Sequence, residues 1–153
     1  MNIIRSHSDV ILHDVFVALE ESIDQYVDGA EFLGKSSLAE FFKELSAERL
    51  VLLEQLGEII HNTGHLPPAA DNDKESLRFA LQHFFANLAD NAILEVLEQC
   101  LNQEREVAAT FKQLLTIEST QSDKLVFKAI YKSHRFARLY LCLLCEHYRN
   151  PAL

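Results

Sequence analysis

The sequence predicts an all-α protein in which two up-down helical hairpins form a four-helix bundle, with a short crossover helix between the hairpins. Three observations favour this fold class. Nearly half of the 153 residues are apolar, the chain has only 4 glycines and 3 prolines, and apolar residues recur with the helical period in four long stretches. We expect residues 1–153 to form a single domain, because this length is enough for one apolar core.

The first hairpin is expected to consist of helices at Asp9–Leu33 and Ser37–His61. The turn between them, Gly34 to Ser36, is so short that the two helices should run antiparallel. The second helix opens with Ser37 and Glu40 in the spacing of a capping box. In that motif the serine hydroxyl accepts a hydrogen bond from a free backbone N–H, and the glutamate reaches back to the start of the helix.

The second hairpin is expected at Asn91–Leu115 and Ser122–His147, joined by a turn at Thr116–Gln121. Between the two hairpins, Lys74–Leu88 has the apolar period of a shorter helix. We interpret this helix as part of a crossover that carries the chain to the far end of the bundle. We expect no β-strand.

Charge and composition exclude several kinds of partner. The formal net charge of −9 argues against binding to nucleic acid or to an anionic membrane, because both attract Lys and Arg. No run of about 18 apolar residues predicts a transmembrane span, and no signal-peptide pattern opens the chain. The cysteines, Cys100, Cys142 and Cys145, lie beside leucines in helical patterns. This setting predicts reduced, buried thiols and a cytoplasmic protein.

Four polar residues lie on or beside the apolar stripes, near the middle of their helices: Glu48, Arg49, Glu104 and His134. Mid-helix positions of an antiparallel bundle lie at similar heights, so these side chains could meet in one buried polar layer. Glu104 lies near the centre of its stripe, where a carboxylate must be paired, protonated or bound to a metal. Two interpretations are therefore open: Glu104 pairs with Arg49 or His134, or it binds a metal ion.

A resemblance to a known family rests on the order and spacing of several segments. These are Leu12-His13-Asp14-Val15, the Glu20 to Tyr26 region, the run from Leu38 to Arg49, the Gly64-x-x-Pro67 break, Val96-Leu97-Glu98-Gln99-Cys100 with Glu104, and Phe111. From Leu12 to His134, the sequence resembles a bacterial four-helix-bundle family of unassigned function within the ferritin-like superfamily.

The resemblance implies a metal site that has lost half of its ligands. Ferritin-like metal proteins use one Glu from each of two helices and a Glu-x-x-His motif from each of the other two. Glu104 matches a lone Glu, Glu48 matches the first residue of one motif, and His134 matches the last residue of the other. The three remaining positions fall on Ile23, Val51 and Tyr131. The resemblance therefore implies the fold but not the usual di-iron chemistry.

The functional expectation is a non-enzymatic bundle that acts as an interaction or stress-related structural module with a degenerate metal site. No catalytic residue and no cofactor are expected. The alternative is a ferritin-like oxidase or storage protein that binds one divalent ion of iron, manganese or zinc through Glu48, Glu104 and His134.

The last helix has a second apolar line, Phe136, Leu139 and Leu143, apart from the stripe that should face the bundle. A helix that is apolar on two sides is buried on more than one face, so this line predicts a homodimer interface. The alternative is that the crossover helix covers the line within one chain, through Phe79, Phe84 or Phe85.

Overall fold

The computed structural model describes residues 6–67 and 92–150. Over these residues the chain forms α1 (His7–Leu33), α2 (Ser37–Asn62), α4 (Ala92–Leu114) and α5 (Gln121–Arg149), and no strand. The all-α prediction is confirmed, and each of the four helices begins and ends within about two residues of its expected limits. The predicted helix at Lys74–Leu88 lies outside the described residues.

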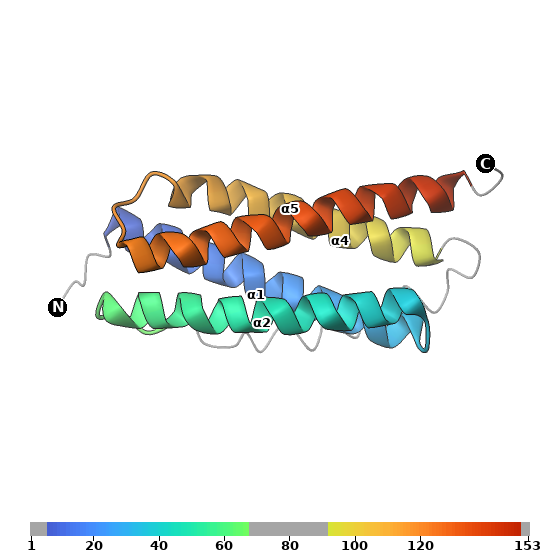
Figure 1. Cartoon of the computed structure of the whole chain (residues 1–153), viewed down its shortest axis with the longest axis horizontal. Coiled ribbons are helices and arrows are strands. Elements are labelled where there is room, and N and C mark those ends of the chain that lie inside the picture. Colours follow the sequence, from blue (N-terminus) through green and yellow to red (C-terminus); the bar gives the residue numbers. More distant parts are fainter. Residues whose placement is uncertain (1–5, 68–91, 151–153) are drawn as a thin grey trace.

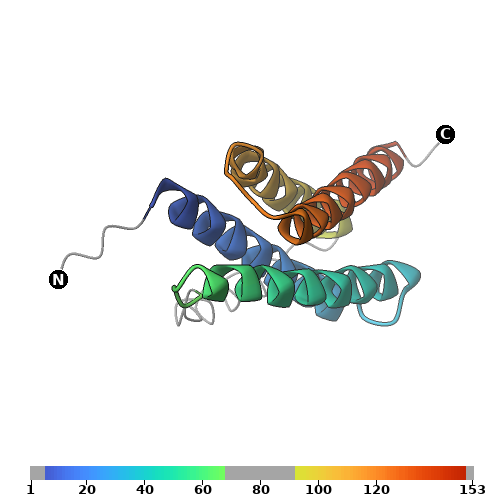
Figure 2. The same ribbon diagram turned by 60° about the vertical axis from the view of Figure 1, so that its left-hand side comes forward.

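The four helices form two antiparallel hairpins that close at opposite ends of the bundle (Figure 1). The end of α2 and the start of α4 also lie at opposite ends. The chain therefore enters the second hairpin far from where it leaves the first, as a crossover topology requires. In Figure 2, α1 and α2 form one layer and α4 and α5 the other. The layers meet most extensively where α1 packs on α4, and less where α2 meets α5.

The apolar core is divided into two clusters along the bundle. One lies among the first half of α1, the second half of α2, and the helix ends beside the α4–α5 turn, and it includes Leu12, Val15, Leu56, Phe111 and Ile130. The other lies toward the α1–α2 turn and includes Phe42, Leu45, Leu97, Ala137 and Leu141. The boundary between them falls at mid-helix in all four elements, which is where a polar layer could be placed.

The N-cap of α2 differs from the prediction by one residue. Ser36, not Ser37, is the N-cap, and its Oγ accepts a hydrogen bond from the Ala39 N–H at 3.1 Å. The third residue of the helix is therefore Ala39 and not Glu40, so no capping box forms there. The Ser-x-x-Glu pattern gave the wrong N-cap because Ser36 and Ser37 are adjacent, and either serine can occupy the N-cap position by sequence alone.

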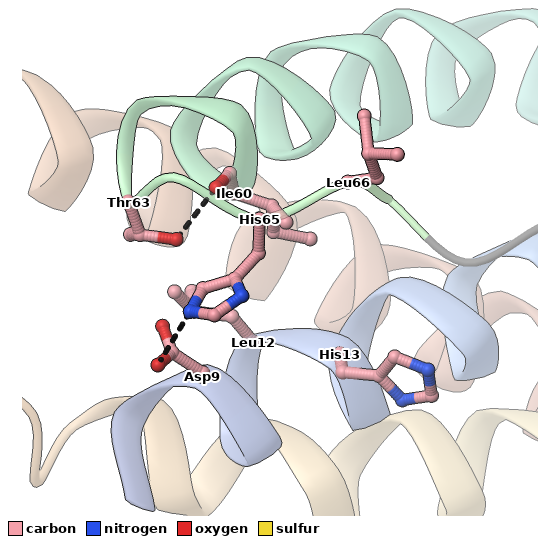
Figure 3. A pocket seen from close by; sticks show the side chains of 7 residues that line it. All are labelled: Asp9, Leu12, His13, Ile60, Thr63, His65 and Leu66. Atoms are coloured by element: carbon pink, nitrogen blue, oxygen red, sulfur yellow. Dashed lines mark hydrogen bonds and ion pairs between the residues drawn. The ribbon is translucent and has the colours of Figure 1, made fainter. Parts of the chain in front are cut away.

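A capping box does form at the start of α1, where it also ties α1 to the end of α2. The Asp9 N–H donates to Ser6 Oγ, and the Ser6 N–H donates to Asp9 Oδ2 at 3.0 Å. His65 Nε2 lies 3.1 Å from the same carboxylate oxygen, and Figure 3 shows the two side chains facing each other. The hydrogen bond from Ser6 holds the pKa of Asp9 below its ordinary value, and His65 adds to this effect. The cavity beside this pair is only about 10 Å³, room for about one water molecule.

None of the described helices combines the length and the apolar character needed to cross a bilayer.

Gly29 of α1 lies close to side chains of α2 and α4, which generates a prediction about stability. A Cβ at Gly29 would lie 2.8 Å from Cε2 of Phe42 on α2 and 3.3 Å from Cγ1 of Val96 on α4. Phe42 is fully buried in the core. Gly29→Ala should therefore lower the free energy of unfolding by about 1–3 kcal/mol, as overpacked cores do, when urea unfolding is followed by circular dichroism.

Gly57→Ala is the matched control, because Gly57 also lies inside a helix but its nearest atoms are 3.5 Å or more from a built Cβ. This variant should raise the free energy of unfolding by about 0.5–1 kcal/mol, through the better helix propensity of Ala. Equal behaviour of the two variants would contradict the close packing at Gly29.

Candidate functional site

An ion pair between Arg49 of α2 and Glu104 of α4 lies at the centre of the bundle. Arg49 Nη1 is 2.6 Å from Glu104 Oε1, and neither side chain has any exposed surface. α2 and α4 are not among the extensively packed helix pairs, so this ion pair joins elements across the interior. Among the residues that the structure describes, Arg49 has the largest side chain that is completely buried.

Two further side chains donate hydrogen bonds to the Glu104 carboxylate. The Tyr26 hydroxyl of α1 donates to Oε1 at 2.5 Å. His134 of α5 places Nδ1 at 2.9 Å from Oε2. An ionised carboxylate has no proton to donate, so Nδ1 of His134 carries the hydrogen of this bond. Glu104 thus receives donors from all three of the other helices.

Arg49 has its own set of partners around the ion pair. Nη1 also donates to Ser22 Oγ at 3.0 Å, and Nε donates to Ser133 Oγ at 3.3 Å. The Tyr26 ring lies against the guanidinium, with its centroid 5.3 Å from Cζ, a distance typical of a cation–π contact. Nη2 is buried and has no hydrogen-bond partner among the described residues.

These surroundings keep both members of the ion pair charged. Burial by itself raises the pKa of the Glu104 carboxyl, but the hydrogen bond from His134 and the charge of Arg49 outweigh burial and hold this pKa below its ordinary value. Burial lowers the pKa of the Arg49 guanidinium, yet the charge of Glu104 more than compensates and the pKa is raised. Burial and the Glu104 charge raise the pKa of Tyr26 well above its ordinary value, so its hydroxyl remains a donor.

The structure brings Arg49, Glu104 and His134 together but leaves Glu48 outside. The Glu48 side chain is exposed, because a helical residue points about 100° away from its neighbour and Arg49 takes the inward position. The prediction that Glu48 shares the buried layer is therefore wrong. The sequence places Glu48 at the edge of its stripe, where the helical period alone does not separate an inward from an outward side chain.

Three members of the layer were missed by sequence reasoning: Ser22, Tyr26 and Ser133. Tyr26 lies on the apolar stripe of α1, where its ring resembles the other apolar core residues in sequence. A buried tyrosine hydroxyl usually has a hydrogen-bond partner. Applied to this mid-helix tyrosine, that rule could have predicted its place in the polar layer. The two serines are small enough to pass for ordinary packing residues, and no sequence pattern singles them out.

The residues present do not fit a di-metal centre of the ferritin-like kind. The Glu104 oxygens face Arg49, Tyr26 and His134, and the guanidinium occupies the space beside the carboxylate that a cation would need. Glu48 does not reach this carboxylate. Among the described residues, no group of three or more His, Cys, Asp or Glu side chains is placed to hold a metal ion.

The second apolar line lies on the exposed side of α5. Phe136, Leu139 and Leu143 have 57%, 60% and 65% of their surface exposed. Phe136 also stacks on Tyr140, at 6.1 Å between ring centroids, and Tyr140 lies 4.4 Å from the ring of Phe41 on α2. The aromatic rings thus extend the line toward α2. The alternative cover, Phe79, Phe84 and Phe85, lies outside the described residues.

The cysteines are free, but only two of them are buried. Cys100 and Cys145 are buried, and burial raises the pKa of both thiols. Cys142 is exposed, which corrects the expectation of three buried thiols. Cys142 follows Leu139 by three residues on α5, so the two side chains are neighbours on the helix surface and the thiol lies at the side of the second apolar line.

The Arg49–Glu104 pair generates a prediction for a double-mutant cycle. Glu104→Leu should lower the free energy of unfolding by about 3–5 kcal/mol, because it leaves Arg49 buried without its charge partner. Adding Arg49→Met should recover much of this loss, since an apolar pair of similar volume has no charge to desolvate. Urea unfolding of the wild type, both single variants and the double variant measures the coupling. Additive losses would contradict the pairing.

The lowered pKa of Glu104 generates a prediction about acid stability. A carboxyl whose pKa is lower in the folded than in the unfolded protein stabilises the fold above its unfolded pKa, and this contribution is lost as the pH falls through its folded pKa. Glu104→Gln cannot titrate there. The stability difference between wild type and Glu104→Gln should therefore be greatest above about pH 4.5 and shrink below it. Unfolding curves at a series of pH values test this, and a difference that grows on acidification would contradict it.

Comparisons with known proteins agree with this architecture. The family model described as "Ferritin-like domain" matches residues 22–131, which is more than two thirds of the chain and includes Tyr26, Arg49 and Glu104. No curated protein and no solved structure matches the chain. The extent of the family match and the four-helix architecture together show that the chain belongs to the ferritin-like family.

Proposed function

We propose that this protein is a non-enzymatic ferritin-like module that acts by self-association, as an interaction or stress-related structural component of the cytoplasm. The observation that carries this proposal is the Arg49–Glu104 pair. A fully buried guanidinium bound to a carboxylate at 2.6 Å supplies a fixed positive charge inside the bundle. That charge disfavours a second cation at the same carboxylate.

The polar layer supports a structural role better than a catalytic one. Arg49 and Glu104 have no exposed surface, and His134 has only 6%, so a substrate has no direct access to them. Glu104 keeps a lowered pKa, whereas a general base is most effective with a pKa near the working pH. Three unpaired cysteines are typical of a reducing compartment, which supports the cytoplasmic assignment.

The exposed line on α5 supports a second copy as the partner. Phe136, Leu139 and Leu143 form one row, and burying a side chain of this size stabilises by about 1.5–3 kcal/mol. An antiparallel two-fold pairing centred between Leu139 and Tyr140 would place Phe136 of one copy over Leu143 of the other. It would also bring Glu146, at one end of the row, toward Lys132 and Arg135 of the second copy. Closed two-fold dimers are the commonest soluble oligomers.

The proposal predicts a dimer without resident metal. Protein purified without added metal should sediment as a dimer at micromolar concentration, and elemental analysis should find no stoichiometric iron, manganese or zinc. Phe136→Glu and Leu143→Glu should each yield a helical monomer, because a buried charge at the interface lacks a partner. Leu50→Glu is the matched control: Leu50 is 48% exposed on α2 and does not belong to the row, so this variant should remain a dimer.

Cys142 offers an independent measurement of the same geometry. Cys100 and Cys145 are buried, so a short bismaleimide should link two copies only through Cys142. Linked dimers should form in the wild type and disappear in Cys142→Ser and in Phe136→Glu. A monomeric wild type would overturn self-association, and stoichiometric metal would overturn the non-metal role of the polar layer.

A further inference from the structure

A cavity between the end of α4 and the start of α5 has the features of a ligand site and is distinct from the polar layer and from the exposed α5 row. Its volume is about 390 Å³, within the usual range of small-molecule sites of about 300–1,000 Å³. It is partly enclosed and opens to the surface beside the α4–α5 turn. None of the residues discussed for the polar layer lines it.

The walls of the cavity are mainly apolar. Phe111, Leu114 and Phe127 line it, and each is buried in the core cluster nearest to that turn. Tyr131 forms another wall and stacks on Phe111, with 5.5 Å between ring centroids. These side chains favour an apolar ligand body over a polar one.

The polar groups of the cavity are mainly two cations. Lys124 and Lys128 line it, one helical turn apart on α5, and both are exposed. Neither forms an ion pair with any described carboxylate. Ser119 adds a hydroxyl, and no acidic side chain belongs to the lining. In a chain of formal net charge −9, Lys124 and Lys128 are the only charged side chains among the described residues that line this cavity, which favours an anionic ligand.

We propose that this cavity binds a free single-chain amphiphile with an anionic head group, such as a long-chain carboxylate. The hydrocarbon chain lies among Phe111, Leu114 and Phe127, and the carboxylate lies at Lys124 and Lys128. The apolar walls supply affinity through burial of methylene groups, and the lysines choose the charge of the head group. The site does not depend on self-association, because the Phe136–Leu143 row does not line it.

Calorimetric titration with dodecanoate below its micelle concentration tests the proposal. Dodecanoate should bind with about one site per chain, and dodecanol and dodecyltrimethylammonium should bind more weakly. Shorter carboxylates should lose up to about fourfold in affinity per methylene removed, which is the transfer free energy of one CH₂. Equal binding of the three head groups, or no dependence on chain length, would overturn the site.

Two lysine variants locate the head group. The double variant Lys124→Gln, Lys128→Gln should weaken dodecanoate binding by up to about tenfold, the usual range for two exposed ion pairs, and leave dodecanol unchanged. Arg138→Gln is the control: it removes one positive charge from the same helix, but Arg138 is exposed and does not line the cavity. An equal loss in Arg138→Gln, or no loss in the double variant, would show that the head group is not held at Lys124 and Lys128.

Two further measurements distinguish binding of a free amphiphile from dimer formation and from attachment to a membrane surface. Phe136→Glu should bind dodecanoate with wild-type affinity even if it is monomeric, so failure of the proposed dimer and failure of this site are distinguishable. Vesicles of an anionic phospholipid should not retain the protein. Binding to vesicles in the absence of dodecanoate binding would identify a membrane surface and overturn the free amphiphile as ligand.

Discussion

The charge pair of Arg49 and Glu104 is the interaction on which the interior of this bundle depends. A guanidinium and a carboxylate without exposed surface are tolerated only if each finds enough partners to replace water. Tyr26, His134, Ser22 and Ser133 supply those partners. Because the residues of this network come from all four helices, the pair constrains the height of each helix relative to the others. Such a pair adds little net stability compared with apolar packing, so its main effect here is to specify one register.

The polar layer also explains how the apolar core is arranged. Two apolar clusters lie on either side of the layer, and each resembles a small helical bundle that is closed by one of the two turns. A shift of one helix by a single turn would place an apolar residue beside Arg49 or a polar residue inside a cluster. Both outcomes bury an unpaired group. The layer therefore opposes the sliding that a uniformly apolar four-helix interior would permit.

The positive charge in this interior differs in kind from that of a ferritin-like di-metal centre. A di-metal centre holds cations by means of several carboxylates, and here one carboxylate holds a cation that belongs to the protein itself. Arg49 places a fixed positive charge directly beside the Glu104 carboxylate. The two surface features proposed as binding sites both lie on α5. Its outward side carries both the exposed apolar row at Phe136–Leu143 and, near its start, the lysines of the apolar cavity.

The sequence alone determined the fold class, the limits of the four described helices and three members of the polar layer. Helical periodicity is a local property, so it can be seen without knowledge of the partners of each helix. The same periodicity placed Arg49, Glu104 and His134 on inward faces. Only the tertiary structure decided which inward residues touch. It excluded Glu48, whose angle at the edge of the stripe was ambiguous, and it added Tyr26 and the two serines, which look like core residues in sequence. It also decided the α2 N-cap, Ser36 instead of Ser37, and the cavity at Lys124. These features depend on distances between elements, and such distances are set by packing and not by the pattern of any one helix.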